Sequence, residues 1–70
     1  MLSLAELYKH KPRVKLAESL VPARRLELIV DMETHILRFV VTKWDAAGKQ
    51  VSQKHYDVLH FAVDDYDGGL

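Results

Sequence analysis

Cysteine is absent from this 70-residue chain, and glycine and proline are scarce, with three and two residues respectively. Without cysteine the chain can form neither a disulfide nor a thiolate metal site, which stabilise many very small domains. Three glycines, two of them adjacent near the end of the sequence, cannot build a glycine-rich phosphate loop. Apolar runs such as Leu28–Val30 fall far short of the roughly 20 residues that a membrane-spanning helix needs.

Net charge is also absent, because ten basic residues balance ten acidic ones. Nucleic-acid binding draws on a basic surface, so this balance argues against a dedicated polyanion binder. It also gives the chain no charge that would oppose self-association. The segment Met1–Glu6 lacks the basic and long apolar regions of a secretory signal, and we therefore expect a cytoplasmic protein.

Apolar residues, in contrast, make up 49% of the chain. A chain this short forms one domain and buries only roughly 60% of the surface that its unfolded form exposes. We expect a single small domain over residues 1–70, with residues 64–70 as a flexible tail. We also expect a protein partner or a second copy to add to its stability.

The first third of the chain has the residue spacing of helices. Ser3 and Glu6 match a capping box, which predicts a helix that ends before Pro12. Pro12 can then begin a second helix that reaches residue 21. The alternative is a short strand over Arg13–Leu16, but the sequence LAESL contains good helix formers and favours the helix.

From residue 24 onward apolar residues recur at every second position, which predicts β-strands over 24–33, 36–44 and 49–56. Asp45–Gly48 suits a type I turn closed by a left-handed glycine, and Thr34–His35 is the predicted tip of the first hairpin. This register sets Phe39 opposite Val30 on one side and opposite His55 on the other. The predicted core face consists of Leu26, Leu28, Val30, Met32, Leu37, Phe39, Val41 and Val51.

After the third strand, Asp57 can cap a short helix that carries Leu59, Ala62 and Tyr66. The alternative is that the third strand continues through Phe61. The predicted fold is therefore α+β, with N-terminal helical segments packed on a three-stranded antiparallel β-meander and a short C-terminal helix.

The candidate catalytic and metal-binding residues do not converge. His55 and His60 are five residues apart, which is not an established metal-ligand spacing. Ser52, His55 and Asp57 supply the residue types of a hydrolytic triad, but Ser52 and His55 project from opposite faces of one strand. We expect no enzyme, no cofactor and no metal site.

One local charge excess does stand out, between residues 9 and 25, where six cations accompany a single acid, Glu18. These cations define the alternative function, a regulator that binds nucleic acid, although a solvated edge of the domain explains them as well. They are Lys9, Lys11, Arg13, Lys15, Arg24 and Arg25.

The second face of the predicted sheet is unusually apolar for a surface that faces water. Trp44, beside a turn, has the residue type and setting of an interface anchor. Either the C-terminal segment covers this face or another chain does. The predicted partner interface comprises Trp44, Val40, Ile29, Ile36, Arg38 and Tyr56.

From this apolar face we expect a non-catalytic protein-interaction module that acts as an adaptor, regulator or stoichiometric inhibitor. Compact inhibitors encoded by phages and mobile elements have this size. Self-association through the second face, as a homodimer, is part of the same hypothesis.

Overall fold

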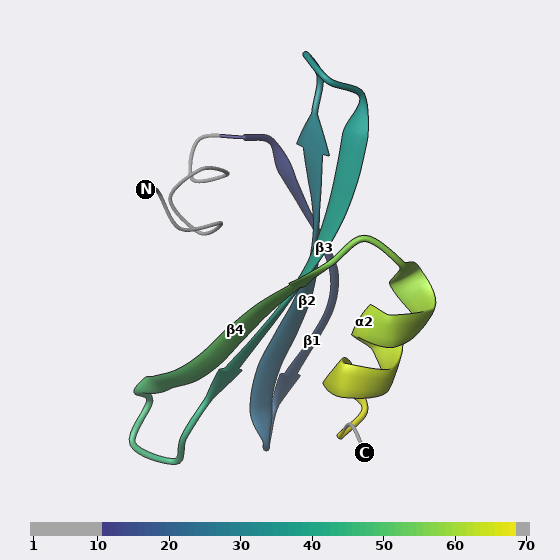
Figure 1. Cartoon of the computed structure of the whole chain (residues 1–70). Coiled ribbons are helices and arrows are strands. Elements are labelled where there is room, and N and C mark those ends of the chain that lie inside the picture. The colour runs from purple at the N-terminus through teal and green to yellow at the C-terminus, as the bar shows by residue number, and fades with distance from the viewer. Residues whose placement is uncertain (1–10, 69–70) are drawn as a thin grey trace.

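The computed structural model describes residues 11–68, which form one antiparallel sheet with a helix packed against it (Figure 1). Consecutive strands are neighbours throughout, in the order β1-β2-β3-β4. The elements are β1 (Arg13–Leu20), β2 (Ala23–Asp31), β3 (Ile36–Trp44), β4 (Gln50–Tyr56) and the helix α2 (Leu59–Tyr66).

The predicted fold class was wrong in its N-terminal half. Arg13–Leu20 is a strand of the sheet and not a helix, so the sheet has four strands and not three. The two-residue turn at Val21–Pro22 places Leu20 opposite Ala23, and β1 then pairs along β2. This pairing outweighs the modest helix propensity of LAESL. The helix predicted to begin at Ser3 lies outside the described residues.

The hairpin between β2 and β3 has a four-residue turn, over residues 32–35, in place of the predicted two-residue tip. Asp31 shapes it, because its Oδ1 accepts hydrogen bonds from the backbone N–H groups of Glu33 (3.0 Å) and Thr34 (3.3 Å). The longer turn sets Val30 opposite Leu37 and not Phe39. A shift of two residues keeps every side chain on its predicted face.

The turn between β3 and β4 confirms the prediction for Asp45–Gly48. The N–H of Asp45 donates to the carbonyl of Lys49 (2.9 Å), and Gly48 has a φ of 84°. Trp44 accordingly lies opposite Gln50.

A β-bulge then follows at Val51, because the next pair is Lys43 with Ser52. The bulge moves the rest of β4 by one residue, so that Phe39 faces Tyr56 and not His55. A one-residue shift moves each side chain to the other face. Tyr56 therefore leaves the second face, where it was predicted, and His55 joins it.

The face of the sheet that bears α2, here called the α2 face, contains a small core of Leu26, Val41 and Ala62. The C-terminal helix is thus confirmed, but it covers this face and not the second one. Its N-cap is Val58, without a side-chain cap, and not the predicted Asp57.

Only part of the predicted core face is buried. Helix α2 has eight residues and is therefore about 12 Å long, which is too short to cover the whole face. Phe39 packs partly buried beside the core. Three other members of the predicted set are largely exposed, namely Met32 (68%), Leu37 (50%) and Val51 (60%).

The second face has its own buried centre, formed by Ile29 and Val40, neither of which has exposed surface. Thr42 is also buried there, and its Oγ1 accepts a hydrogen bond from the side-chain amide of Gln53 (3.2 Å). The middle of the central strand pair, β2 with β3, is therefore buried on both faces.

Val40→Ala tests this second core. Removing two methyl groups from a fully buried site should lower the free energy of unfolding by about 2 kcal/mol, measured by urea titration. Val51→Ala is the matched control, because the same change at a side chain that is 60% exposed should alter stability little. Equal effects of the two substitutions would contradict the burial of Val40.

Candidate functional site

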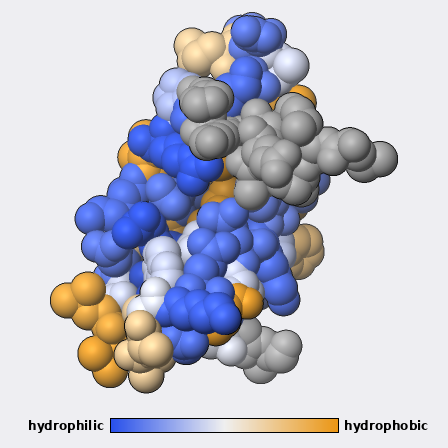
Figure 2. All heavy atoms as spheres, turned by 90° about the vertical axis from the view of Figure 1, so that its left-hand side faces the viewer, coloured by the Kyte–Doolittle hydropathy of each residue, from blue (hydrophilic) through white to orange (hydrophobic). Residues whose placement is uncertain are grey.

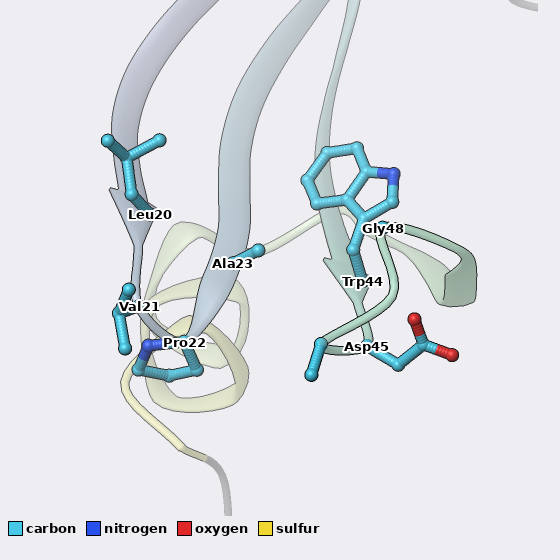
Figure 3. A pocket seen from close by; sticks show the side chains of 8 residues that line it. Leu20, Val21, Pro22, Ala23, Trp44, Asp45 and Gly48 are labelled. Atoms are coloured by element: carbon cyan, nitrogen blue, oxygen red, sulfur yellow. The ribbon is translucent and has the colours of Figure 1, made fainter.

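A row of three side chains crosses the second face at the end of the sheet that carries the turns β1–β2 and β3–β4. Leu20 of β1 is paired with Ala23 of β2. Trp44 of β3 lies on the other side of Ala23, because it is one residue beyond the pair Arg24–Lys43. The small side chain of Ala23 lies between the two larger ones (Figure 3). This order, large, small and large, leaves a trough across the sheet.

The trough is part of a cleft of about 430 Å³. Its lining is apolar except for Asp45, whose carboxylate already accepts hydrogen bonds from the backbone N–H groups of Ala47 and Lys49, both at 2.9 Å. The cleft therefore suits apolar contact better than recognition of a polar substrate. The lining residues are Leu20, Val21, Pro22, Ala23, Trp44, Asp45, Ala46 and Gly48.

Two of the lining residues are the most exposed large apolar side chains of the described chain, Leu20 at 83% and Val21 at 91%. Figure 2 shows hydrophobic side chains clustered at the lower end of the molecule, beside largely hydrophilic surface. Leaving such side chains in water forfeits roughly 1.5–3 kcal/mol for each one.

Trp44 is only partly buried, and its indole ring is contacted by a charged side chain. The guanidinium carbon of Arg25 lies 5.1 Å from the centre of the indole ring, within the range of a cation–π contact. Arg25 Nε also donates to Glu18 Oε2 (3.0 Å). Hydrogen bonds from Lys15 and from Arg25 lower the pKa of Glu18, so this carboxylate stays charged at neutral pH. The face of the indole ring is thus contacted by a cation that is itself paired with a carboxylate.

The interface residues predicted from the sequence do not form one exposed surface. Ile29 and Val40 offer no surface, and Tyr56 lies on the α2 face. Ile36 is 39% exposed but is eight residues from Trp44 along β3, or about 26 Å. Arg38 is half-buried on the second face.

Sequence reasoning missed three residues that shape the cleft: Leu20, Val21 and Ala23. The available signal was the placement of two apolar residues directly before Pro22, a residue that favours turns. Turns lie at the surface of a domain, so apolar residues in a turn are exposed. Exposed apolar residues of this kind indicate a contact surface.

The basic segment does not form one patch. Lys11 pairs with Asp31 (3.5 Å) and Arg13 with Glu27 (3.7 Å). Lys15 and Arg25 share the carboxylate of Glu18.

Arg24 lies on the opposite, α2 face, where its guanidinium donates to the backbone carbonyl of Tyr66. Lys9 is outside the described residues. Since the described cations are engaged by acidic groups or a carbonyl and lie on two faces, they do not form a surface arranged for phosphates.

Other chemistry is sparse in the described residues. Residues 11–68 contain no group of three or more His, Asp or Glu side chains placed to hold a metal ion. Ser52 and His55 lie on opposite faces, because they pair with Lys43 and Val40. Burial lowers the pKa of His55, and the charges of Arg13 and Arg38 lower it further. No helix within the described range has the length and apolar character to cross a membrane.

A polar cluster fastens α2 to the sheet. Asp65 accepts a hydrogen bond from Lys43 Nζ at 2.7 Å and another from the Tyr56 hydroxyl at 2.8 Å. Burial raises the pKa of Asp65, but these two hydrogen bonds and the charges of Lys43 and Lys54 together outweigh that effect and hold the pKa below its ordinary value. The cluster connects the helix with β3 and β4 and is structural.

No known protein family, curated protein or solved structure shows a significant match to this chain. The surface described above is therefore the basis on which its function can be inferred.

The Asp65 cluster predicts a loss of stability in acid. A carboxylate whose pKa is lowered by folding stabilises the protein above the ordinary aspartate pKa of about 3.9, and this contribution is lost as the pH falls through the lowered value. Asp65→Asn should therefore be less stable than the wild type at pH 7, and the difference should shrink toward pH 2. Chemical unfolding at several pH values measures it.

The control is Asp64→Asn on the same helix, whose side chain is 54% exposed. It should change stability little at pH 7. A difference between wild type and Asp65→Asn that stays constant from pH 7 to pH 2 would show that the cluster does not fasten the helix through charge.

Proposed function

We propose that this chain is a small, non-catalytic protein-interaction module that binds a protein partner through the cleft beside Trp44. The observation that carries the proposal is the exposure of Leu20 and Val21 next to a tryptophan that Arg25 contacts. Aromatic anchors beside apolar pockets dominate the binding energy of protein interfaces. An adaptor, a regulator and a stoichiometric inhibitor all work through such a contact.

The chemistry of the cleft supports binding over catalysis. Its one ionisable side chain, Asp45, serves the turn that carries it. A catalytic acid or base must lie within hydrogen-bond reach of the proton that it transfers, and the one carboxylate of the lining is engaged by the backbone of its own turn. Binding makes a smaller demand on the cleft. A side chain of a partner protein can cover this lining if its shape is complementary.

The proposal predicts that filling the trough abolishes binding. Ala23→Leu places a larger side chain between Leu20 and Trp44, where a partner side chain would insert, and should weaken the complex at least tenfold. Affinity capture from the native cell identifies the partner. Titration with that partner, followed by the fluorescence of the chain's single tryptophan, then measures the affinity.

The matched control is Ala47→Leu, the same change in the neighbouring turn at an exposed residue that does not line the cleft. It should bind the partner like the wild type. A partner that binds the wild type and Ala23→Leu with equal affinity uses another surface, and that result would contradict the proposed site.

A further inference from the structure

Strand β1 lies at an edge of the sheet. Within residues 11–68 it pairs with β2 alone, and no described strand occupies its outer side. Three of its apolar side chains are exposed, Val14 at 51%, Leu16 at 45% and Leu20 at 83%. A strand in this position can accept another strand through its backbone N–H and C=O groups.

The charges along β1 are arranged so that the strand complements itself. When two copies run antiparallel with all eight residues overlapping, Arg13 of one copy lies opposite Leu20 of the other. Lys15 then lies opposite Glu18 of the second copy. Two-fold symmetry repeats this contact, so both Lys15 side chains meet a carboxylate. Opposite charges across neighbouring strands stabilise a sheet.

The same register also matches the faces of the sheet. Lys15 is paired with Glu27 and Glu18 with Arg25, so both project from the second face. The bulge between Lys15 and Ala17 makes this possible, because residues three apart in a regular strand point to opposite faces. Val14 and Ser19, which this register also pairs, both lie on the α2 face, since Val14 is opposite Leu28 and Ser19 is opposite Arg24.

The other edge strand has no such pattern. Lys54 is the only Lys, Arg, Asp or Glu residue of β4, so two antiparallel copies of β4 would place no opposite charges together. A lysine and a bulge are features that protect edge strands from indiscriminate pairing. On β1 the lysine and the bulge select one kind of incoming strand. Lys15 favours a strand that presents a carboxylate at the position opposite to it, and a second copy of β1 does so with Glu18.

We propose that two copies of this chain associate through the outer edges of β1, antiparallel and in full overlap, with Lys15 of each copy paired with Glu18 of the other. The two four-stranded sheets then form one continuous sheet. Because the strands run in opposite directions, the two Trp44 clefts lie at opposite ends of the dimer. The inference does not depend on the proposed function of the cleft.

Two charge variants and their mixture test the pairing by analytical ultracentrifugation. Lys15→Glu gives each copy two carboxylates at the contact, and Glu18→Lys gives each copy two ammonium groups. Each variant alone should dimerise at least tenfold more weakly than the wild type. The equimolar mixture should recover dimers, because only the mixed pair brings opposite charges together at both contacts.

The mixture also controls for effects inside one copy, since Lys15 and Glu18 contact each other within the strand (3.2 Å). Mixing cannot repair a contact within a copy. The proposal is overturned if the wild type stays monomeric up to about 1 mM, which corresponds to a binding free energy weaker than about 4 kcal/mol. It is also overturned if either variant dimerises like the wild type, or if the mixture forms no more dimer than its components.

A further variant separates this inference from the proposed function. Ala23→Leu alters the cleft and should leave dimerisation unchanged. If Ala23→Leu dimerises but loses the partner, and only the mixture of the two charge variants recovers dimers, both proposals stand. If the charge variants remain dimeric while Ala23→Leu loses the partner, the β1 pairing fails and the cleft proposal stands.

Discussion

The rest of this structure depends on the central strand pair, β2 with β3, because the middle of this pair is buried on both faces. Leu26 lies opposite Val41 beneath Ala62 of α2, and Ile29 and Val40 form the buried centre of the second face. A chain of this size has little surface to bury, so both faces of its longest hairpin are used. The edge strands and the helix are added to this pair.

Burial at the centre leaves the exposed apolar surface at the ends and edges of the sheet. One end carries the cleft, where the small side chain of Ala23 separates Leu20 from Trp44. The edge strand β1 carries the exposed Val14 and Leu16. Both proposals follow from this distribution, since an apolar surface of this kind is stabilised when a partner covers it.

The sequence allowed prediction of the elements whose apolar residues alternate without interruption. The run Ile36–Trp44 and the turn after it are present as predicted, and the C-terminal helix was recognised from the apolar spacing between Leu59 and Tyr66. The two main errors lie at the two bulges. Near Leu16 a bulge interrupts the alternation of β1, so that the segment resembled a helix, and at Val51 a bulge shifts β4 by one residue.

The candidate site was predictable in part. Trp44 could be identified from its residue type beside a turn, but its neighbours could not. Leu20 reaches the site through the pairing of β1 that was missed, and Ala23 lies beside Trp44 through the β2–β3 register, which differs by two residues from the predicted one. The length of the first hairpin turn depends on hydrogen bonds to Asp31, which a pattern of apolar residues does not reveal. The turn length decides which residues of β2 and β3 lie opposite each other. The neighbours of Trp44 on the second face could therefore be learned only from the structure.

Amide hydrogen exchange at low and high protein concentration tests the central claim, that the middle of the sheet is closed and the β1 edge is open to a second copy. The amides of β2 and β3 should exchange slowest at both concentrations, and those of β1 should gain protection as the concentration rises, while those of β4 should not. Exchange in β1 that does not change with concentration, or protection gained by β4 instead, would contradict the account.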